Sequence, residues 1–384
     1  MSKPRDPATI IATAGIGAAA PTGGLISPLH ATDTYAWPDS DTKPAYDYSR
    51  TVNPNRDQLC AALCELEGAA GGVVTGSGQS ATLLALLPLV AGALVVAPHD
   101  CYGGTYRLLC GLRDSGKLAL CFVDMADPTA LTTALAERPA LVWIETPSNP
   151  LLRITDVAAI AAAARDAGAC TVADNTLATP CRQQPLALGC DYVMHSTTKA
   201  LNGHADLYGG ALLARDAADV EQLRWWSNAA GLNASAHDSW QTLRGLRTLT
   251  LRVDRQEATA TAIASWLSTR DEVSAVHYPG LPSHPGKAVA DRQTSGPGFM
   301  LSFELSGGEA AVAPFLAGLR LITLASSLGG FSTLICKPAT MTHRGMPPEA
   351  QAAAGIRPDL LRLSIGLEAA ENLIADLDRG LSAV

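Results

Sequence analysis

The stretch that decides the fold runs from residue 170 to residue 199 and reads CTVADNTLATPCRQQPLALGCDYVMHSTTK. It contains two short apolar segments, CTVAD at 170–174 and CDYVMHS at 190–196, each with the length of a buried strand. Asp174 ends the first segment, and the second runs into Ser196-Thr197-Thr198-Lys199. Ligands of open α/β sheets bind at the carboxyl ends of the strands, so we expect these polar groups to form part of a site.

The same pattern continues on both sides of this stretch. Strand-like segments alternate with helical ones such as DVAAIAAAARDAG, and the strand-like set is GGVVTGSG, ALVVAP, ALCFVD, ALVWIE, CTVAD, CDYVMHS and GGALLA. Alternating helices and strands are typical of a mostly parallel sheet covered by helices. The sequence therefore predicts an α/β fold built on a mostly parallel seven-stranded sheet.

Composition and pattern divide the chain into three parts. Residues 1–50 are turn-rich and predict an arm or loop layer, and residues 51–246 hold the alternating pattern. A long helix over residues 247–268 opens a third part, 247–384, in which mixed strands and helices predict a smaller C-terminal α+β domain.

Charge and cysteine content exclude several classes of protein. A net charge of -8 over 384 residues, without a basic tract, argues against nucleic acid as a partner. The nine cysteines lack zinc-ribbon spacing and predict reduced thiols, with neither a disulfide framework nor a metal site. The longest apolar stretch, Ala81–Pro98, is interrupted by Pro88 and Gly92, so we expect no membrane span. The N-terminus shows no signal-peptide pattern, which predicts a cytoplasmic protein.

Two nucleotide-binding motifs are absent or misleading. Gly15-Ile-Gly17-Ala-Ala-Ala20 fits the dinucleotide pattern, but Pro21 and two glycines follow, and no strand–helix–strand unit surrounds it. No P-loop pattern precedes a Lys-Ser or Lys-Thr pair anywhere in the chain. We therefore expect neither a dinucleotide nor a nucleoside triphosphate.

An acid after one strand and a lysine after the next point to pyridoxal phosphate. A carboxylate such as Asp174 can keep a pyridine nitrogen protonated, and a desolvated lysine such as Lys199 can form an imine with a carbonyl. Gly78 and Gln79 begin a helix after a glycine-rich turn, where backbone amides favour a phosphate. Tyr102 is an aromatic side chain able to stack on a flat ring.

Several motifs together resemble those of the Cys/Met-metabolism pyridoxal-phosphate enzymes, and most of all the cystathionine γ-synthase and γ-lyase group. They occur in the family's order over nearly the whole chain: YDYSR with Asn53-Pro54, DCYGGTYRL, ETPSNPL, ADNTLATP, HSTTKALNGHAD, SLGG and MTHRGMPPEA. The resemblance implies a fold-type I pyridoxal-phosphate transferase.

The resemblance also implies a role for individual residues. Lys199 would bind the cofactor covalently and move protons, Asp174 would pair with the ring nitrogen, Tyr102 would stack on the ring, and Asn149 would reach its phenolic oxygen. The remaining cofactor residues would be Gly78, Gln79, Thr176, Ser196 and Thr198, with Tyr48 and Arg50 reaching the phosphate of a neighbouring subunit. Arg362 would bind the substrate α-carboxylate, and Asp47, Arg107 and Ser327 would contact the rest of the substrate.

The activity that the resemblance implies is chemistry at the γ-carbon of a small amino acid. Loss of the α-proton and then of a β-proton expels the γ-substituent. Addition of a thiol gives γ-replacement, as when an O-acyl-homoserine and cysteine form cystathionine, whereas hydrolysis to an oxo-acid and ammonia gives γ-elimination. The active form would be a homo-oligomer, a tetramer built as a dimer of dimers in most of the family.

Departures from the family pattern leave a second reading open. Ser326 and Ser332 stand where close relatives carry glutamates, one of which binds the amino group of the incoming cysteine. Their loss favours a specialised γ-lyase acting on an unusual amino acid, such as a γ-halogenated or unsaturated one, whereas Arg107 and Asp47 favour the synthase. A third reading, an inactive structural or regulatory protein that binds the cofactor, disagrees with the intact Lys199.

Overall fold

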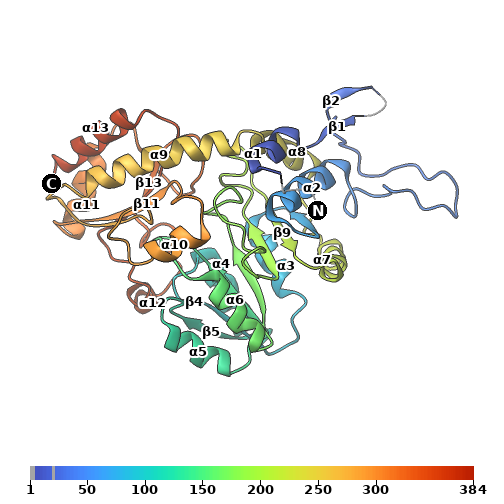
Figure 1. Cartoon of the computed structure of the whole chain (residues 1–384), viewed down its shortest axis with the longest axis horizontal. Helices are drawn as coiled ribbons and strands as arrows, with labels where there is room; N and C mark the ends of the chain where they lie inside the picture. The colour runs from blue at the N-terminus through green and yellow to red at the C-terminus, as the bar shows by residue number, and fades with distance from the viewer. Residues whose placement is uncertain (1–4, 20–21) are drawn as a thin grey trace.

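The computed structural model describes residues 5–19 and 22–384, and its centre is a seven-stranded sheet (Figure 1). In spatial order the strands are β3 (Gly71–Thr75), β9 (Gly210–Ala214), β8 (Tyr192–His195), β7 (Cys170–Asp174), β6 (Leu141–Glu145), β4 (Ala93–Pro98) and β5 (Leu118–Val123). Strands β8, β7, β6, β4 and β5 are parallel, and β9 is antiparallel to both of its neighbours. The predicted mostly parallel sheet is therefore confirmed.

Helices cover both faces of this sheet because successive side chains of each strand point to opposite faces. Val95 packs in one cluster with α3 (Gly78–Leu86), α4 (Gly103–Asp114) and α7 (Ala217–Ala230). Its neighbour Val96 packs on the opposite side with α5 (Pro128–Ala136) and α6 (Val157–Asp166).

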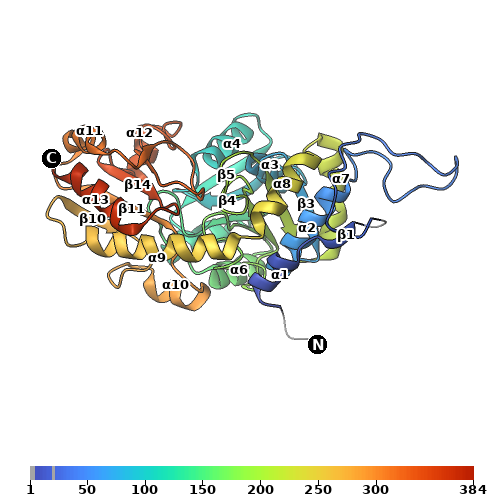
Figure 2. The same cartoon turned by 90° about the horizontal axis from the view of Figure 1, so that it is seen from above.

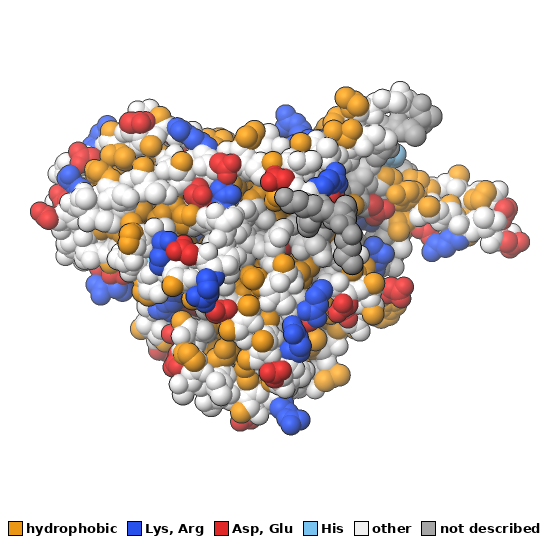
Figure 3. Space-filling model, viewed as in Figure 1, with side chains coloured by type: hydrophobic (Ala, Val, Ile, Leu, Met, Phe, Trp, Pro, Cys, Tyr) orange, Lys and Arg blue, Asp and Glu red, His pale blue; other side chains and the backbone are white. Residues whose placement is uncertain are grey.

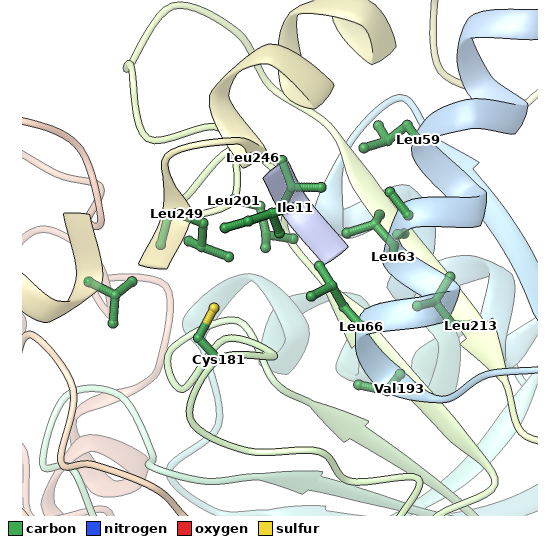
Figure 4. Packing of buried hydrophobic residues seen from close by; sticks show 14 of the residues in the cluster. Ile11, Leu59, Leu63, Leu66, Cys181, Val193, Leu201, Leu213, Leu246 and Leu249 are labelled. Atoms are coloured by element: carbon green, nitrogen blue, oxygen red, sulfur yellow. The ribbon is translucent and has the colours of Figure 1, made fainter. Parts of the chain in front are cut away.

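At the β8–β9 end of the sheet, α2 (Pro54–Glu67) and α8 (Ala236–Leu246) complete the core (Figure 4). Leu63 of α2 is fully buried there, and a buried leucine cut to alanine costs about 2–5 kcal/mol. Gly68 ends α2 in the left-handed conformation (φ 71°), which glycine adopts without steric cost.

The long helix α9 (Leu249–Leu267) leads from this sheet to a second one (Figures 1 and 2). The second sheet has the order β10 (Val273–His277), β11 (Met300–Leu305), β14 (Leu360–Ser364), β13 (Leu334–Cys336) and β12 (Thr323–Leu324). Its helices are α10 (Lys287–Gln293), α11 (Glu309–Gly318), α12 (Pro348–Ala353) and α13 (Ala370–Leu381). This is the smaller α+β unit that the sequence predicts.

The N-terminal region contains a helix that the sequence analysis missed. Helix α1 (Pro7–Thr13) buries Ile10 and Ile11 against the core of the first sheet (Figure 4). A helix of seven residues has about two turns, too few for a periodic pattern of apolar residues to stand out in the sequence. A hairpin of β1 (Ile16–Ala19) and β2 (Gly24–Ile26) follows, in place of the helix that a dinucleotide motif needs. Ala20, the last residue of that motif, and Pro21 after it lie outside the described residues.

The segment between β2 and α2 projects from the body of the molecule (Figures 1 and 2). Within it, Thr34 and Tyr48 form an isolated antiparallel bridge. On the face shown in Figure 3, acidic and basic side chains are interspersed. Among the described residues, no helix combines the length and the apolar character needed to cross a bilayer.

Candidate active site

A cavity of about 760 Å³ lies between the carboxyl ends of the first sheet and residues of the second sheet and its loops. Its lining comes from segments far apart in the sequence: Ser77, Gly78, Gln79, Tyr102, Arg107, Glu145, Asn149, Asp174, Thr176, Leu177, Met194, Ser196, Thr198, Lys199, Ser326, Ser327, Leu328, Thr340, Met341, Thr342, Arg344 and Arg362. Thus 12 of the predicted site residues share one cavity, as the strand-end rule leads us to expect.

The inner wall of the cavity is a row of strand ends. Glu145 of β6 pairs in register with Asp174 of β7, which pairs with Met194 of β8. Partners in a parallel ladder project to the same face, so all three side chains reach the cavity. The backbone amide of Thr176 donates to Asp174 Oδ1 at 3.0 Å. Burial raises the pKa of Asp174, and the hydrogen bonds from Thr176 oppose that shift.

Lys199 follows β8 in a tight turn and projects into the cavity. The turn is held by Lys199 N–H donating to the carbonyl of Ser196 and by Gly203 N–H donating to the carbonyl of Lys199. Burial, and then the positive charge of Arg362, lowers the pKa of Lys199 to about 8. About a tenth of this amine is therefore neutral and nucleophilic at pH 7, far more than for a lysine with an ordinary pKa.

Ser327 connects Lys199 to Arg362. Lys199 Nζ donates to Ser327 Oγ at 2.9 Å, and Arg362 donates to the Ser327 carbonyl at 2.9 Å. Ser327 has a φ of 89°, a conformation that costs a non-glycine residue about 1–3 kcal/mol. The loop that imposes it packs closely on the lysine turn, because a Cβ on Gly329 would meet the amide nitrogen of Ala200 at 2.6 Å.

Arg362 is a buried cation without a carboxylate partner among the described residues. It lies on β14 between β11 and β13, with 2% of its surface exposed. Its guanidinium donates to Asn149 Oδ1 at 2.7 Å and to Ser327 O, while its Nε has no partner. A buried charge is costly unless it is paired, so this guanidinium fits an anion that enters the cavity.

The beginning of α3 and the residues after β8 form a small polar cradle. The amides of Gly78 and Gln79 lie in the first turn of α3 and have no intrahelical acceptor. Ser196 lies against this turn so closely that a Cβ on Gly78 would meet the Ser196 Cβ at 2.9 Å. Free amides, a helix N-terminus and the hydroxyls of Ser196 and Thr198 together suit a phosphate group.

Tyr102 lines the cavity at the start of α4. Its amide donates to Glu145 Oε2 at 2.8 Å, which fixes the residue at the start of α4. A Cβ on Gly104 would meet the Tyr102 ring at 2.5 Å, so glycine leaves room for the ring to fold back over this turn. Burial, followed by the charge of Asp174, raises the pKa of Glu145 well above its usual range.

These residues fit pyridoxal phosphate. The cavity combines a lysine with a depressed pKa, a strand-end carboxylate, a phosphate cradle and an aromatic side chain able to stack on a ring. The glycine contacts at Gly78 and Gly104 leave space that larger residues would fill. The fit rests on the donor set and the shape of the cavity.

Three predicted residues do not join the others. Asp47, Tyr48 and Arg50 lie on the projecting segment and are not part of the cavity lining. Arg50 donates to the carbonyl and side-chain oxygens of Asn228 and stacks on Tyr48, and Asp47 pairs with Lys43 at 3.5 Å. A role for them in a neighbouring subunit stays a prediction.

The two serines that depart from the family pattern, Ser326 and Ser332, lie in different places. Ser326 lines the cavity, whereas Ser332 does not. The residue at position 326 therefore contributes to the cavity wall, whereas the residue at position 332 does not.

Two charged residues of the cavity were not singled out from the sequence. Glu145 ends a buried strand, as Asp174 does, and the same rule applied to ALVWIE would have found it. Arg344 lies in the loop between β13 and α12, where no strand end marks it. Only the packing of that loop against α4 brings Arg344 to the cavity.

Comparisons with known proteins agree with this chemistry. The family model of the Cys/Met metabolism PLP-dependent enzymes matches residues 8–382. Cystathionine γ-synthase of Escherichia coli (strain K12) is 49% identical over 99% of this chain and 98% of that protein. Cystathionine γ-lyase of Bacillus subtilis (strain 168) is 38% identical over 98% of this chain and 99% of that protein. The structure of cystathionine γ-synthase from Xanthomonas oryzae pv. oryzae in complex with cystathionine superposes with a TM-score of 0.98, at 50% identity over 99% of both chains.

Proposed function

Because the chain belongs to the Cys/Met metabolism PLP-dependent enzyme family, we propose that it joins an O-acyl-homoserine and cysteine into cystathionine. The class of enzyme and its cofactor follow from the family, and the substrates are the proposed part. The observation that carries the proposal is the buried, unpaired guanidinium of Arg362 beside Lys199. It provides the cavity with a site for the α-carboxylate of an amino acid.

The inner wall holds the cofactor. Lys199 would bind it, Asp174 would pair with its ring nitrogen, Tyr102 would stack on the ring, and the cradle at Gly78 and Ser196 would take its phosphate. Asn149, Thr176, Thr198 and Gln79 complete this set. Bound pyridoxal phosphate withdraws electrons from the amino acid, which makes the hydrogens on Cα and Cβ acidic.

The protein's own groups then position the substrate and move protons. Arg362 binds the α-carboxylate, and Asn149 and the Ser327 carbonyl keep the guanidinium plane fixed. The Nζ of Lys199 takes the proton from Cα, and its lowered pKa makes it a competent base near neutral pH. Ser327 Oγ accepts a hydrogen bond from that nitrogen and holds it on this side of the cavity.

Two outcomes are open after the γ-substituent leaves with its bonding electrons. In γ-replacement the cysteine thiolate adds at Cγ, and the products are cystathionine and the free carboxylate. In γ-elimination water completes the reaction, and the products are 2-oxobutyrate, ammonia and the carboxylate. Ser326 leaves the cavity wall without the carboxylate that would attract an ammonium group, and this favours the specialised γ-lyase as the second candidate.

We also propose that the protein forms a homotetramer and lies in the cytoplasm. Tyr48 and Arg50, on the projecting segment, would complete the phosphate site of a neighbouring subunit in a homotetramer, with Asp47 near its substrate. The nine cysteines are all free, which supports a reducing compartment such as the cytoplasm.

The test is an assay of both products. Purified enzyme is incubated with O-succinyl-L-homoserine, with and without cysteine, and cystathionine and 2-oxobutyrate are measured. Efficient formation of cystathionine establishes the synthase. Production of 2-oxobutyrate at the same rate with and without cysteine favours the lyase. If an enzyme loaded with cofactor makes neither product, the proposal is wrong, and γ-halogenated and unsaturated amino acids become the substrates to screen.

A further inference from the structure

Helix α9 packs into two hydrophobic cores, one at each of its ends (Figures 1 and 2). Leu249 and Val253, near its start, are buried in the core that α2 and α8 complete at the first sheet. Ile263 and Leu267, near its end, are buried in the core of the second sheet. The middle of the helix therefore lies where the two units meet.

Two long polar side chains are buried in this middle stretch. Arg252 has 6% of its surface exposed, and Gln256 has 0%. They are four residues apart and so lie on the same face of the helix. A buried guanidinium or amide is costly unless it is hydrogen-bonded, so the partners of these two groups indicate their role.

Arg252 binds the turn that carries Lys199. Its guanidinium donates to the carbonyl of Ala200, the residue after the lysine, at 2.8 Å and to the carbonyl of Gly245 at 2.8 Å. It also packs against Gly203, where a Cβ would collide with the guanidinium. Burial lowers the pKa of Arg252 to about 10, so it is still a cation near neutral pH. The backbone of the lysine turn is thus held by a buried positive charge.

Gln256 binds two segments of the second unit. Its Nε2 donates to the carbonyl of Gly330 at 2.8 Å and to the carbonyl of Ile365 at 2.9 Å. Gly330 belongs to the loop that carries Ser327, and Ile365 follows β14, the strand that carries Arg362. One amide group thus holds the loop and the strand that supply the two residues linked to the catalytic lysine.

We propose that Arg252 and Gln256 are positioning residues, which set the place of Lys199 relative to Ser327 and so hold the lysine Nζ where it takes the proton from Cα. The carbonyls that they bind lie one residue after the lysine and three residues after the serine. A shift of either carbonyl therefore moves one end of the 2.9 Å hydrogen bond between Lys199 Nζ and Ser327 Oγ. Neither α9 side chain belongs to the cavity lining, so both act through the backbone that they hold. The inference rests on the proposed function and deepens it.

The first test is the kinetics of Gln256→Met, a change that keeps the length of the side chain and removes its donor. With O-succinyl-L-homoserine and cysteine, kcat of the holoenzyme is expected to fall about tenfold, because a small misplacement of a catalytic group slows the reaction strongly. KM is expected to change less than threefold, because β14 and Asn149 still hold Arg362. Arg252→Lys keeps the charge and a donor, and a loss of about threefold in kcat is expected.

The second test needs no amino-acid substrate. A looser contact exposes the amine of Lys199 to water and raises its pKa above the value of about 8. Capture of the cofactor by apo Gln256→Met should then be about tenfold slower than in the wild type at pH 7, and equal to it within about twofold at pH 10. The other charged or titratable groups of the cavity stay the same in both proteins: Tyr102, Arg107, Glu145, Asp174, Arg344 and Arg362.

Two controls separate positioning from a general loss of structure. Arg255→Gln changes an exposed arginine of α9, and Leu267→Ala removes a buried side chain at the far end of that helix. Leu267→Ala should lower the melting temperature, since it leaves a cavity in the core. Both controls should keep the wild-type pH profile of cofactor capture. The inference is overturned if Leu267→Ala reproduces the kcat loss and the pH profile of Gln256→Met.

The two tests also distinguish failure of this inference from failure of the proposed function. If the wild type makes neither cystathionine nor 2-oxobutyrate but apo Gln256→Met shows the altered pH profile, the positioning role stands and the proposed function falls. If the wild type makes cystathionine and folded Gln256→Met matches it in both kcat and pH profile, the positioning role falls and the proposed function stands.

Discussion

The inner wall and the outer side of the cavity are built differently. At the inner wall, Asp174 and Lys199 follow neighbouring strands of a buried sheet, and their side chains have hydrogen-bond partners within the chain. On the outer side, Arg107 and Arg344 come from a helix and a loop, and they meet only through tertiary packing. The groups that suit the cofactor thus stand at strand ends, whereas the outer side depends on a helix and a loop, where residues can vary without changing the fold.

The largest effect is expected from Lys199→Ala. Loss of the amine removes both the cofactor linkage and the base, so turnover falls by at least ~10³-fold. Absorbance spectra measure the loss of the cofactor linkage, and product assays measure the loss of turnover. Lys287→Ala, a change at a surface ion pair, should leave both normal. A Lys199→Ala variant with wild-type spectrum and turnover would contradict the assignment of the inner wall.

The next effect concerns Arg362, which is linked to Lys199 through Ser327. Arg362→Leu should lower kcat/KM for the amino-acid substrate about 100-fold, because the α-carboxylate loses its partner. Arg362→Lys keeps the charge but loses the paired geometry, and an intermediate value is expected. Thermal unfolding shows whether each variant is folded. An unchanged KM in a folded Arg362→Leu variant would mean that the carboxylate binds elsewhere.

Much of the inner wall could be predicted from the sequence, because strand ends are local features. Asp174 and Lys199 follow apolar runs that the chain itself displays, and the turn before α3 marks the phosphate cradle. The link from Lys199 through Ser327 to Arg362 could not be derived from periodicity, since it joins residues 128 and 35 positions apart across two sheets. Only the family resemblance pointed to those positions.

Other residues were missed or misplaced for similar physical reasons. Helix α1 is too short for its apolar pattern to stand out, and its stability comes from packing of Ile10 and Ile11. Arg344 reaches the cavity because Gly103 and Gly345 permit a close approach of helix and loop. A contact of that kind depends on the folded loop, which no local pattern of residue types specifies.

A pH effect tests the electrostatics of the inner wall. The folded pKa of Lys199, about 8, lies below that of a free lysine, so burial disfavours the charged amine. In the apoprotein only the neutral amine captures the cofactor, and the initial rate of reconstitution should fall about fivefold from pH 8 to pH 7. Stopped-flow absorbance measures this rate. A rate that kept rising tenfold per pH unit up to pH 10 would show an unperturbed lysine.

The lowered pKa of Lys199 also makes the free energy of unfolding of the apoprotein depend on pH. Between pH 8 and the pKa of the unfolded lysine, the unfolded chain binds more protons at this position than the folded chain does. The contribution of Lys199 to the free energy of unfolding of the apoprotein therefore increases as pH rises through that window. The melting temperature of apo wild type minus that of apo Lys199→Ala should therefore increase as pH rises above 8. A difference independent of pH from 7 to 10 would contradict the lowered pKa.

The smallest effect is expected from Ser326→Glu. A carboxylate added to the cavity wall should attract the ammonium group of cysteine and raise the ratio of cystathionine to 2-oxobutyrate about threefold. Ser332→Glu is the matched control, because Ser332 does not line the cavity, and its ratio should stay unchanged. Equal ratios in both variants would mean that position 326 does not face the incoming amine.

The most direct test is a crystal structure of Lys199→Ala with cofactor and O-succinyl-L-homoserine, which this variant is expected to bind without converting. The account predicts the α-carboxylate on Arg362 and the succinyl group on the side of the cavity where Arg107 and Arg344 lie. A substrate bound in the reverse direction, or with its succinyl group away from both outer arginines, would contradict it.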